Sequence, residues 1–229
     1  EATTLAEALS RHFRDEGLEF QPLSPRRWYL RLPAAPAMVT RAPREAAGRH
    51  VDEFLPAGPE ALKWHRLMNE AQMLLHEHPV NEAREERGEL PVNSVWLWGA
   101  GALPERAASS AAAVWSDEPL AGGLARLAGI PCHALPASAA EWLREAGTDA
   151  EVLAVLDELG AAARGGAPGV WRETVQALEK SWFAPLAEAL RARRLARLAI
   201  SCPAPERSRE LVMDAGDFWK FWRAPRRLG

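Results

Sequence analysis

The sequence contains little cysteine. Its 229 residues include two cysteines, Cys132 and Cys202, which share no spacing typical of a metal site. A chain of this length with so few cysteines is typical of proteins in a reducing compartment, so we expect a cytoplasmic protein without disulfide bonds. We predict that both thiols are small residues of the core.

The sequence also lacks long apolar runs and an excess of charge of one sign. No apolar run approaches the roughly 20 residues that span a bilayer, and the N-terminus lacks the basic-then-apolar order of a secretory signal. The net charge of −3 differs from the basic excess of most proteins that bind nucleic acids or anionic membranes. We therefore expect no nucleic acid and no membrane partner, and we interpret the basic end "WKFWRAPRRLG" as a solvated end or a partner for acidic groups of the same chain.

Common catalytic signatures are missing as well. There is no G-x-S-x-G nucleophile turn and no G-x-x-x-x-G-K-[ST] phosphate loop. His76 and His78 lie two positions apart, so on a helix they point about 200° apart and cannot share one metal ion. We expect this pair to cap or pack at a helix C-terminus. The residues alone predict no catalytic residue, no metal site and no cofactor.

The N-terminal part has the pattern of a helix followed by a hairpin. Thr3 or Thr4 is predicted to cap a helix that ends at Gly17, and "LEFQPL" and "RWYLRLP" are predicted strands joined by a Ser-Pro turn. The Ala-, Pro- and Arg-rich residues that follow are interpreted as a long ordered loop or linker. These segments predict a small N-terminal α+β piece with its linker over residues 1–57.

The second predicted domain, residues 58–229, opens with a strong helix, "PEALKWHRLMNEAQMLLHEH". Its predicted apolar face comprises Leu62, Leu67, Met68, Ala71, Leu74 and Leu75. After Pro79 one or two further helical turns are predicted, ending at Gly88. From Ser94 onward strand patterns alternate with helix patterns, beginning with "SVWLWG" and "AAVWSD". This alternation predicts an α/β fold with a mixed, mostly parallel sheet flanked by helices.

Two further features qualify as candidate binding elements. Asp117 follows a predicted strand and precedes a predicted helix, at the edge where open α/β sheets bind ligands, although Ser116 or Asp117 could equally cap that helix. The chain also has ten tryptophans against one tyrosine. Core or interdomain packing is the simplest role for these rings, and a ligand or partner surface is the alternative.

The stretch 69–101 resembles a motif of archaeal-type cofactor-independent phosphoglycerate mutases. It fits the order "HP-x-N-x-x-R", Gly, "P-x-N" and a Gly-rich turn through His78, Pro79, Asn81, Arg84, Gly88, Pro91, Asn93, Gly99 and Gly101. A closer resemblance is to bacterial RpfE-type regulatory proteins, which share signatures like those at residues 24–33, 78–81, 91–101 and 217–223. The resemblance to the mutases implies a place in the alkaline-phosphatase superfamily.

The departures from the mutase pattern are as informative as the matches. The mutase family holds two divalent ions through an N-terminal "DG-x-x-D"-like segment and late "D-x-x-x-H" and "DH" motifs, and this chain has none of the three. Its last histidine is His133, and Trp98 replaces the arginine that often ends the mutase strand. Without metal ligands, the phosphoryl-transfer chemistry of that superfamily lacks its Lewis acid.

The resemblance therefore implies a non-catalytic, regulatory relative of these mutases that binds a small phosphorylated or otherwise anionic ligand, or a protein partner. The expected ligand-binding residues are Asn81, Arg84, Asn93, Gly99, Gly101 and Asp117. Arg84 would pair with an anionic group, while Asn93 and the glycine amides would offer hydrogen bonds. Two alternatives remain open: a metal-dependent phosphatase or phosphomutase, and a structural protein that forms a homodimer through a tryptophan-rich surface including Trp219 and Trp222.

Overall fold

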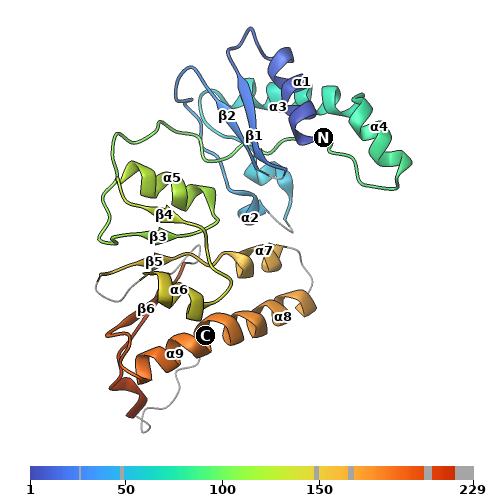
Figure 1. The fold of residues 1–229 in the computed structure, drawn as a ribbon. Coiled ribbons are helices and arrows are strands. Elements are labelled where there is room, and N and C mark those ends of the chain that lie inside the picture. Colours follow the sequence, from blue (N-terminus) through green and yellow to red (C-terminus); the bar gives the residue numbers. More distant parts are fainter. Residues whose placement is uncertain (26, 47–48, 147–149, 165–167, 204–207, 220–229) are drawn as a thin grey trace. The chain divides into compact units, whose positions relative to one another are not determined.

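The protein forms two compact units, Glu1–Leu103 and Pro104–Gly229. Figure 1 shows the computed structural model, which describes residues 1–25, 27–46, 49–146, 150–164, 168–203 and 208–219. In these residues, helices combine with one parallel three-stranded sheet and two antiparallel strand pairs, which confirms the predicted mixed α/β class. The division falls after residue 103 and not after residue 57, because the helix that follows residue 60 shares a core with the N-terminal helix.

The first unit begins with a helix and a hairpin, as predicted. Helix α1 (Ala2–His12) buries Leu5 and Leu9, and Glu1 precedes it in the N-cap position that was predicted for Thr3 or Thr4. Strands β1 (Glu19–Ser24) and β2 (Arg27–Arg31) pair antiparallel, with a register shift between Pro22 and Ser24. The hairpin thus brings Phe20 into the core formed by α1.

A long loop with short elements follows, also as predicted. It contains α2 (Pro43–Ala46), the 3₁₀ helix η1 (Val51–Phe54) and an antiparallel bridge between Val39 and Ala57. Gly58 next to this bridge has φ +112°, and a Cβ atom there would lie 3.0 Å from the Ala37 carbonyl oxygen. Glycine is therefore the residue that this close approach of two backbone segments allows.

Helices α3 (Ala61–His76) and α4 (Pro79–Glu86) complete the first core. α3 buries Trp64, Leu67, Ala71 and Leu75, whereas Leu62, predicted to be on the apolar face, is 84% exposed. Trp64 faces the core, and Leu62 lies two positions before it, so the Leu62 side chain points about 200° away from Trp64 and into solvent. α4 ends as predicted, with Gly88 at φ +72° after its last turn.

The predicted strand "SVWLWG" does not form. Residues 94–99 have no strand partner, although Val95 and Leu97 pack against the first core. The Trp96 indole N–H instead donates to the Arg41 carbonyl oxygen at 2.8 Å, and Trp98 is 47% exposed. The alternation of apolar residues therefore reflects packing on one side of an extended segment and not a place in a sheet.

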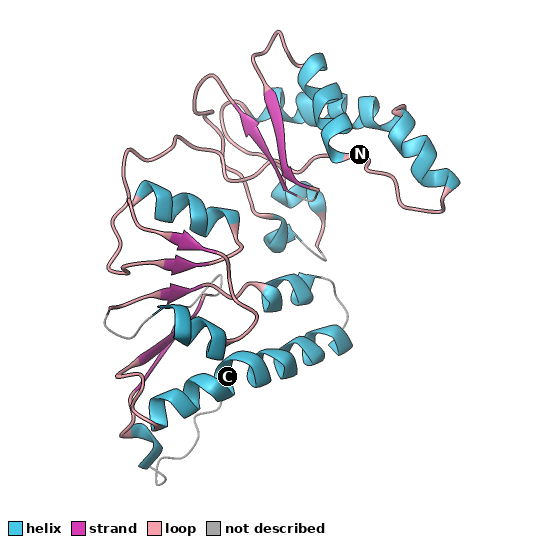
Figure 2. Ribbon diagram, viewed as in Figure 1, coloured by secondary structure: helices cyan, strands magenta, loops and turns pink. Residues whose placement is uncertain are grey.

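The second unit contains the parallel sheet, with strand order β4-β3-β5. Strands β3 (Val114–Trp115), β4 (Cys132–His133) and β5 (Leu153–Ala154) run in the same direction (Figure 2). The connecting helices are α5 (Pro119–Leu127) and α6 (Ala139–Ala146), and α7 (Glu158–Arg164) follows β5. This is the strand–helix alternation that the sequence predicts.

One long helical segment crosses the second unit, as predicted for residues 169–194. It consists of α8 (Pro168–Leu178), the π-helical turn η2 (Glu179–Phe183) and α9 (Ala184–Arg191). The π turn precedes Pro185, which has no N–H to donate to the carbonyl group four residues earlier, so the α-helical ladder is interrupted there. Leu178, Trp182 and Leu186 from this segment pack in the second core with Trp115 and Trp142.

The predicted C-terminal strands form a separate pair. β6 (Leu198–Cys202) and β7 (Arg209–Met213) pair antiparallel, and the 3₁₀ helix η3 (Asp217–Trp219) follows them. The rest of the predicted aromatic helix, including Trp222, lies outside the described residues. No helix in the described part of the chain is long and apolar enough to cross a membrane.

The prediction for the two cysteines was wrong. Cys132 and Cys202 are both free and exposed, because Cys132 lies in a two-residue strand at one edge of the parallel sheet and Cys202 ends β6 of the exposed hairpin. The packing role predicted for tryptophan, in contrast, is observed for three rings of the second core. The Trp142 ring lies 6.1 Å from the Trp115 ring and 5.9 Å from the Trp182 ring between centroids.

Candidate functional site

Asn81, predicted to bind a ligand, is buried within the first unit and bonded to backbone. Its amide nitrogen donates to the carbonyl oxygens of Leu75 at 2.7 Å and Val92 at 2.8 Å, and its carbonyl oxygen accepts the Val92 N–H at 2.8 Å. The side chain is 2% exposed. Asn81 therefore joins the end of α3 to the segment after α4, and these bonds leave little capacity for a ligand.

Arg84 lies one helical turn later and binds two carboxylates. Its Nε donates to the Leu90 carbonyl oxygen at 2.8 Å, while its Nη1 lies 2.7 Å from Glu1 Oε2 and 3.2 Å from Glu89 Oε2. The Arg84 side chain is 22% exposed, so its charge is partly enclosed. The residue predicted to pair with an anion thus pairs with carboxylates of its own chain.

Arg87 completes this group and was missed by the sequence interpretation. Its Nη2 donates to Glu1 Oε1 at 2.6 Å, so Arg84 and Arg87 together hold both oxygen atoms of one carboxylate. Arg87 also binds Glu89, with Nε 3.0 Å from Oε1. The spacing of three residues places both guanidinium groups on one side of α4, which is the signal that could have identified Arg87.

The pKa values of this group follow from its hydrogen bonds. Partial desolvation acts to raise the pKa of the Glu1 carboxyl group, but the hydrogen bonds from Arg84 and Arg87 outweigh it and hold that pKa below its usual value. The hydrogen bond from Arg87 likewise lowers the pKa of Glu89. The bonds to Glu89 and Glu1 raise the pKa of Arg87. Glu1, Glu89 and Arg87 are therefore all charged at neutral pH.

The other predicted residues of the first unit do not join Arg84. Asn93 is exposed, and its side-chain oxygen accepts a long hydrogen bond of 3.5 Å from the Ser94 hydroxyl. The Gly99 N–H donates to the Thr40 hydroxyl oxygen at 3.0 Å, and Gly101 has open space around it. Ligand binding by Asn81, Asn93, Gly99 and Gly101 stays a prediction. His78 caps the N-terminus of α4, since its Nδ1 accepts the Val80 N–H at 3.2 Å, and does not cap a helix C-terminus as predicted.

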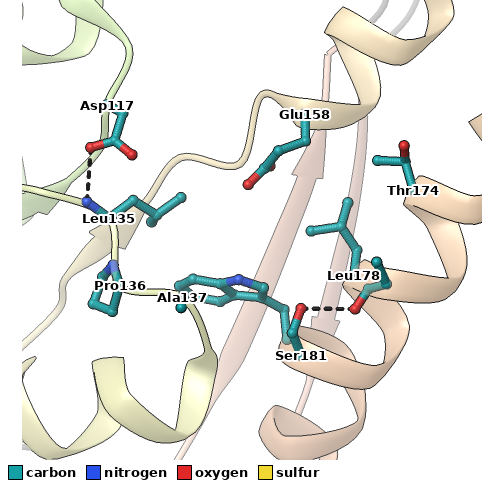
Figure 3. Close-up of a pocket in the computed structure, with 10 residues that line it drawn as sticks. Asp117, Leu135, Pro136, Ala137, Glu158, Thr174, Leu178 and Ser181 are labelled. Carbon is teal, nitrogen blue, oxygen red and sulfur yellow. Dashed lines mark hydrogen bonds between the residues drawn. The ribbon is translucent and has the colours of Figure 1, made fainter. Parts of the chain in front are cut away.

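Asp117 lies in the second unit and lines a pocket of about 330 Å³ (Figure 3). The pocket walls come from residues that follow each of the three parallel strands and from the α8–η2 segment: Asp117, Leu135, Pro136, Ala137, Glu158, Thr174, Ala177, Leu178, Ser181 and Trp182. Figure 3 shows Asp117 with Leu135 and Pro136 on one side and Thr174, Leu178 and Ser181 on the other. Asp117 therefore lies at the carboxyl edge of the parallel strands, and ligand binding at this edge stays a prediction.

Ser116 or Asp117 was predicted to cap the helix that follows, and Asp117 alternatively to bind a ligand. The hydrogen bonds of the two side chains differ. Ser116 is buried, and its hydroxyl oxygen accepts the Glu118 N–H at 3.0 Å, at the start of α5. Asp117 does not cap this helix, because its Oδ1 accepts the Leu135 N–H at 3.2 Å. Ser116 thus orders the turn, which leaves Asp117 at the pocket.

The described residues contain no group of three or more His, Cys, Asp or Glu side chains arranged to hold a metal ion. The second unit brings Asp117 and Glu158 to one pocket. The sequence interpretation missed Glu158, which lies four residues after β5.

The comparisons with known proteins place part of the chain near one group of enzymes. No protein-family model matches the chain. A probable 2,3-bisphosphoglycerate-independent phosphoglycerate mutase of Geobacter sulfurreducens is 40% identical over 70 residues, which are 31% of this chain and 18% of that protein. The mutase of Methanosarcina barkeri is 34% identical over 107 residues, which are 46% of this chain and 27% of that protein.

Part of this chain is related to cofactor-independent phosphoglycerate mutases. The matched part spans less than a third of the length of these curated mutases. The solved structure of a cofactor-independent phosphoglycerate mutase from Thermoplasma acidophilum covers 93% of this chain with a TM-score of 0.40 and 18% identity, and the chain covers 59% of it. The resemblance to RpfE-type regulatory proteins stays a prediction.

Proposed function

We propose that this chain is a regulatory relative of the phosphoglycerate mutases that binds a small carboxylate- or phosphate-bearing ligand through Arg84 and Arg87, without phosphoryl transfer by these residues. One observation carries the proposal: two guanidinium groups hold both oxygen atoms of the Glu1 carboxylate, at 2.7 and 2.6 Å. Paired arginines of this kind can donate hydrogen bonds to two oxygen atoms of a carboxylate or a phosphate group.

Other contacts support the placement of the two arginines. The Leu90 carbonyl oxygen fixes the Arg84 guanidinium through Nε, and Asn81 anchors the same loop two residues later through Val92. Asn81 is thus a positioning residue under this proposal. The Glu1 carboxylate occupies the place that we assign to the ligand, so an incoming anion would have to displace it.

Substitution of the competing carboxylate tests the proposal. We would titrate the full chain with 3-phosphoglycerate and with inorganic phosphate and follow binding by calorimetry. Glu1→Gln removes the competing charge and is expected to tighten binding several-fold, while Arg87→Gln is expected to weaken it about tenfold, equivalent to about 1.4 kcal/mol.

Arg66→Gln is the matched control. Arg66 is a surface arginine of the same unit that binds a carboxylate, Glu70, at 2.7 Å. Its substitution should leave the affinity unchanged. Equal affinities in all four proteins would mean that the anion binds elsewhere and would refute the proposed site.

The metal-dependent phosphatase or phosphomutase remains the second candidate, because the sequence relatives are named as phosphoglycerate mutases. Metal-dependent turnover of a phosphate ester by the purified chain, lost in Asp117→Asn, would favour this enzyme over the binding protein. The third candidate, a tryptophan-mediated homodimer, draws on the 76% exposure of Trp219. It predicts a concentration-dependent mass that Trp219→Ala abolishes.

A further inference from the structure

The pocket of the second unit lies where the strand order of the parallel sheet reverses. β3 connects through α5 to β4 on one side, and the next strand, β5, lies on the other side of β3. Open α/β sheets bind ligands outside the carboxyl ends of the strands at such a point. Asp117 lies two residues after β3 and Glu158 four residues after β5, so both carboxylates belong to this edge.

The polar side chains of the pocket mostly present hydrogen-bond acceptors. The hydroxyl group of Thr174 donates its proton to the Val170 carbonyl oxygen, and that of Ser181 donates to the Ala177 carbonyl oxygen, each at 2.8 Å. The lone pairs of both hydroxyl oxygens remain available. Apart from the indole N–H of Trp182, the lining side chains contain no donor that is free of an intrahelical bond.

The charge of the pocket has one sign. Among its lining residues the ionisable side chains are Asp117 and Glu158, and none is Lys, Arg or His. Leu178 and Trp182, 5% and 2% exposed, add an apolar wall. A phosphate or carboxylate would be repelled here, whereas an ammonium or guanidinium group with a short apolar chain would match both the charge and the wall.

We propose that the pocket between the carboxyl ends of β3 and β5 and the α8–η2 helix binds a small organic cation, an amine or guanidine with a short apolar body. The carboxylates of Asp117 and Glu158 accept hydrogen bonds from its charged end, and the side chains of Leu178 and Trp182 contact its apolar end. The π turn η2 supports this assignment, because π turns in α-helices are frequent at functional sites and this one supplies Ser181 and Trp182. The site lies in a different unit from Arg84 and is independent of the anion proposal.

Amide and indole chemical shifts of the full chain test the proposal. We would titrate n-butylamine, with 1-butanol and butyrate as neutral and anionic probes of similar size, and follow the Ala137 and Leu178 amides and the Trp182 indole. Saturable shifts with the amine and weaker or absent shifts with the other two probes are expected. Asp117→Asn and Glu158→Gln should each raise the amine dissociation constant at least about fivefold.

The matched control is Asp157→Asn, which removes one negative charge next to Glu158 but outside the pocket lining. Its dissociation constant for the amine should stay within about twofold of the parent value. If the amine were attracted non-specifically to an acidic surface, all three substitutions would weaken its binding equally. That result would overturn the proposal. Absence of saturable amine binding, or equal binding of butyrate or butanol, would overturn it as well. Asn and Gln keep a side-chain acceptor, so the hydrogen bond from Leu135 to position 117 can persist and the variants should fold.

Discussion

Asn81 and Arg84 lie three positions apart on α4 and have opposite surroundings. Asn81 is enclosed by backbone groups, while Arg84 reaches the partly exposed carboxylates of Glu1 and Glu89. A polar residue that faces a helix junction can satisfy backbone groups that have no partner in either helix. The segment 78–84 therefore contains one structural residue, Asn81, and one charged residue, Arg84, that pairs with carboxylates.

The Glu89 carboxyl group should make stability depend on pH. Its pKa is lowered, first by the hydrogen bond from Arg87, below the usual value of 4.5. A carboxyl group with a depressed folded-state pKa stabilises the fold above its unfolded-state pKa, and this contribution is lost as the pH falls through the folded-state pKa. We expect the urea midpoint to fall between about pH 5 and about pH 3, and to fall less in Glu89→Gln. The exposed Glu86 of α4 provides the control, and an equal effect of Glu86→Gln would contradict this role of Glu89.

At the scale of elements, two glycines with positive φ differ in their surroundings. Gly58 has φ +112° and its Cβ position lies 3.0 Å from the Ala37 carbonyl oxygen, whereas Gly88 has φ +72° and open space. Gly88→Ala is expected to cost about 1 kcal/mol of unfolding free energy, from the left-handed conformation alone. Gly58→Ala adds a backbone clash and should cost about 3 kcal/mol. Urea unfolding of both variants measures the difference, and equal costs would contradict the close approach.

The elements that the sequence predicted well are those stabilised by local contacts. The periodicity of Leu5 and Leu9 predicts α1, and the glycine at position 88 predicts the end of α4. The segment 94–99 was wrongly predicted as a strand because strand formation depends on a pairing partner that the local pattern does not contain. The same limit applies to the pocket: Asp117 could be proposed from its position after a strand, but its proximity to Thr174 and Ser181 depends on how the long helix packs.

At the scale of the whole molecule, the described residues form two hydrophobic cores that share no residue. One is built on α1, the hairpin and α3, and the other on the Trp115, Trp142 and Trp182 rings with the long helix. The sequence predicted two domains but divided them before α3, because the composition of residues 33–57 is typical of a linker. The composition of residues 33–57 does not predict that Trp64 and Leu75 pack in the same core as α1.

Substitution of Asn81 should reveal whether the two hydrophobic cores lose stability separately. Asn81→Ala removes three hydrogen bonds of a buried side chain and leaves backbone groups of Leu75 and Val92 without this partner, so it should cost about 3 kcal/mol. Hydrogen exchange is expected to accelerate in α3 and α4 and to remain unchanged in β3 and α6. Asn93→Ala, an exposed control, should change stability by less than about 0.5 kcal/mol. Equal acceleration in both units would show that they unfold together.

The π turn in the long helix also restricts how the chain can change in length. Leu178, Trp182, Leu186 and Leu190 are buried at every fourth position. In an uninterrupted α-helix each four-residue step advances about 40° around the axis, so three steps would turn Leu190 about 120° away from Leu178. A wider turn at residues 179–183 offsets part of this advance. A deletion of one residue there would remove the extra residue of the wide turn, restore the regular ladder and leave Leu186 and Leu190 facing the same core. Homologous chains that keep this core should therefore either keep the π turn or lack one residue between Leu178 and Leu186, whereas an insertion or a longer deletion would turn Leu186 and Leu190 away from the core.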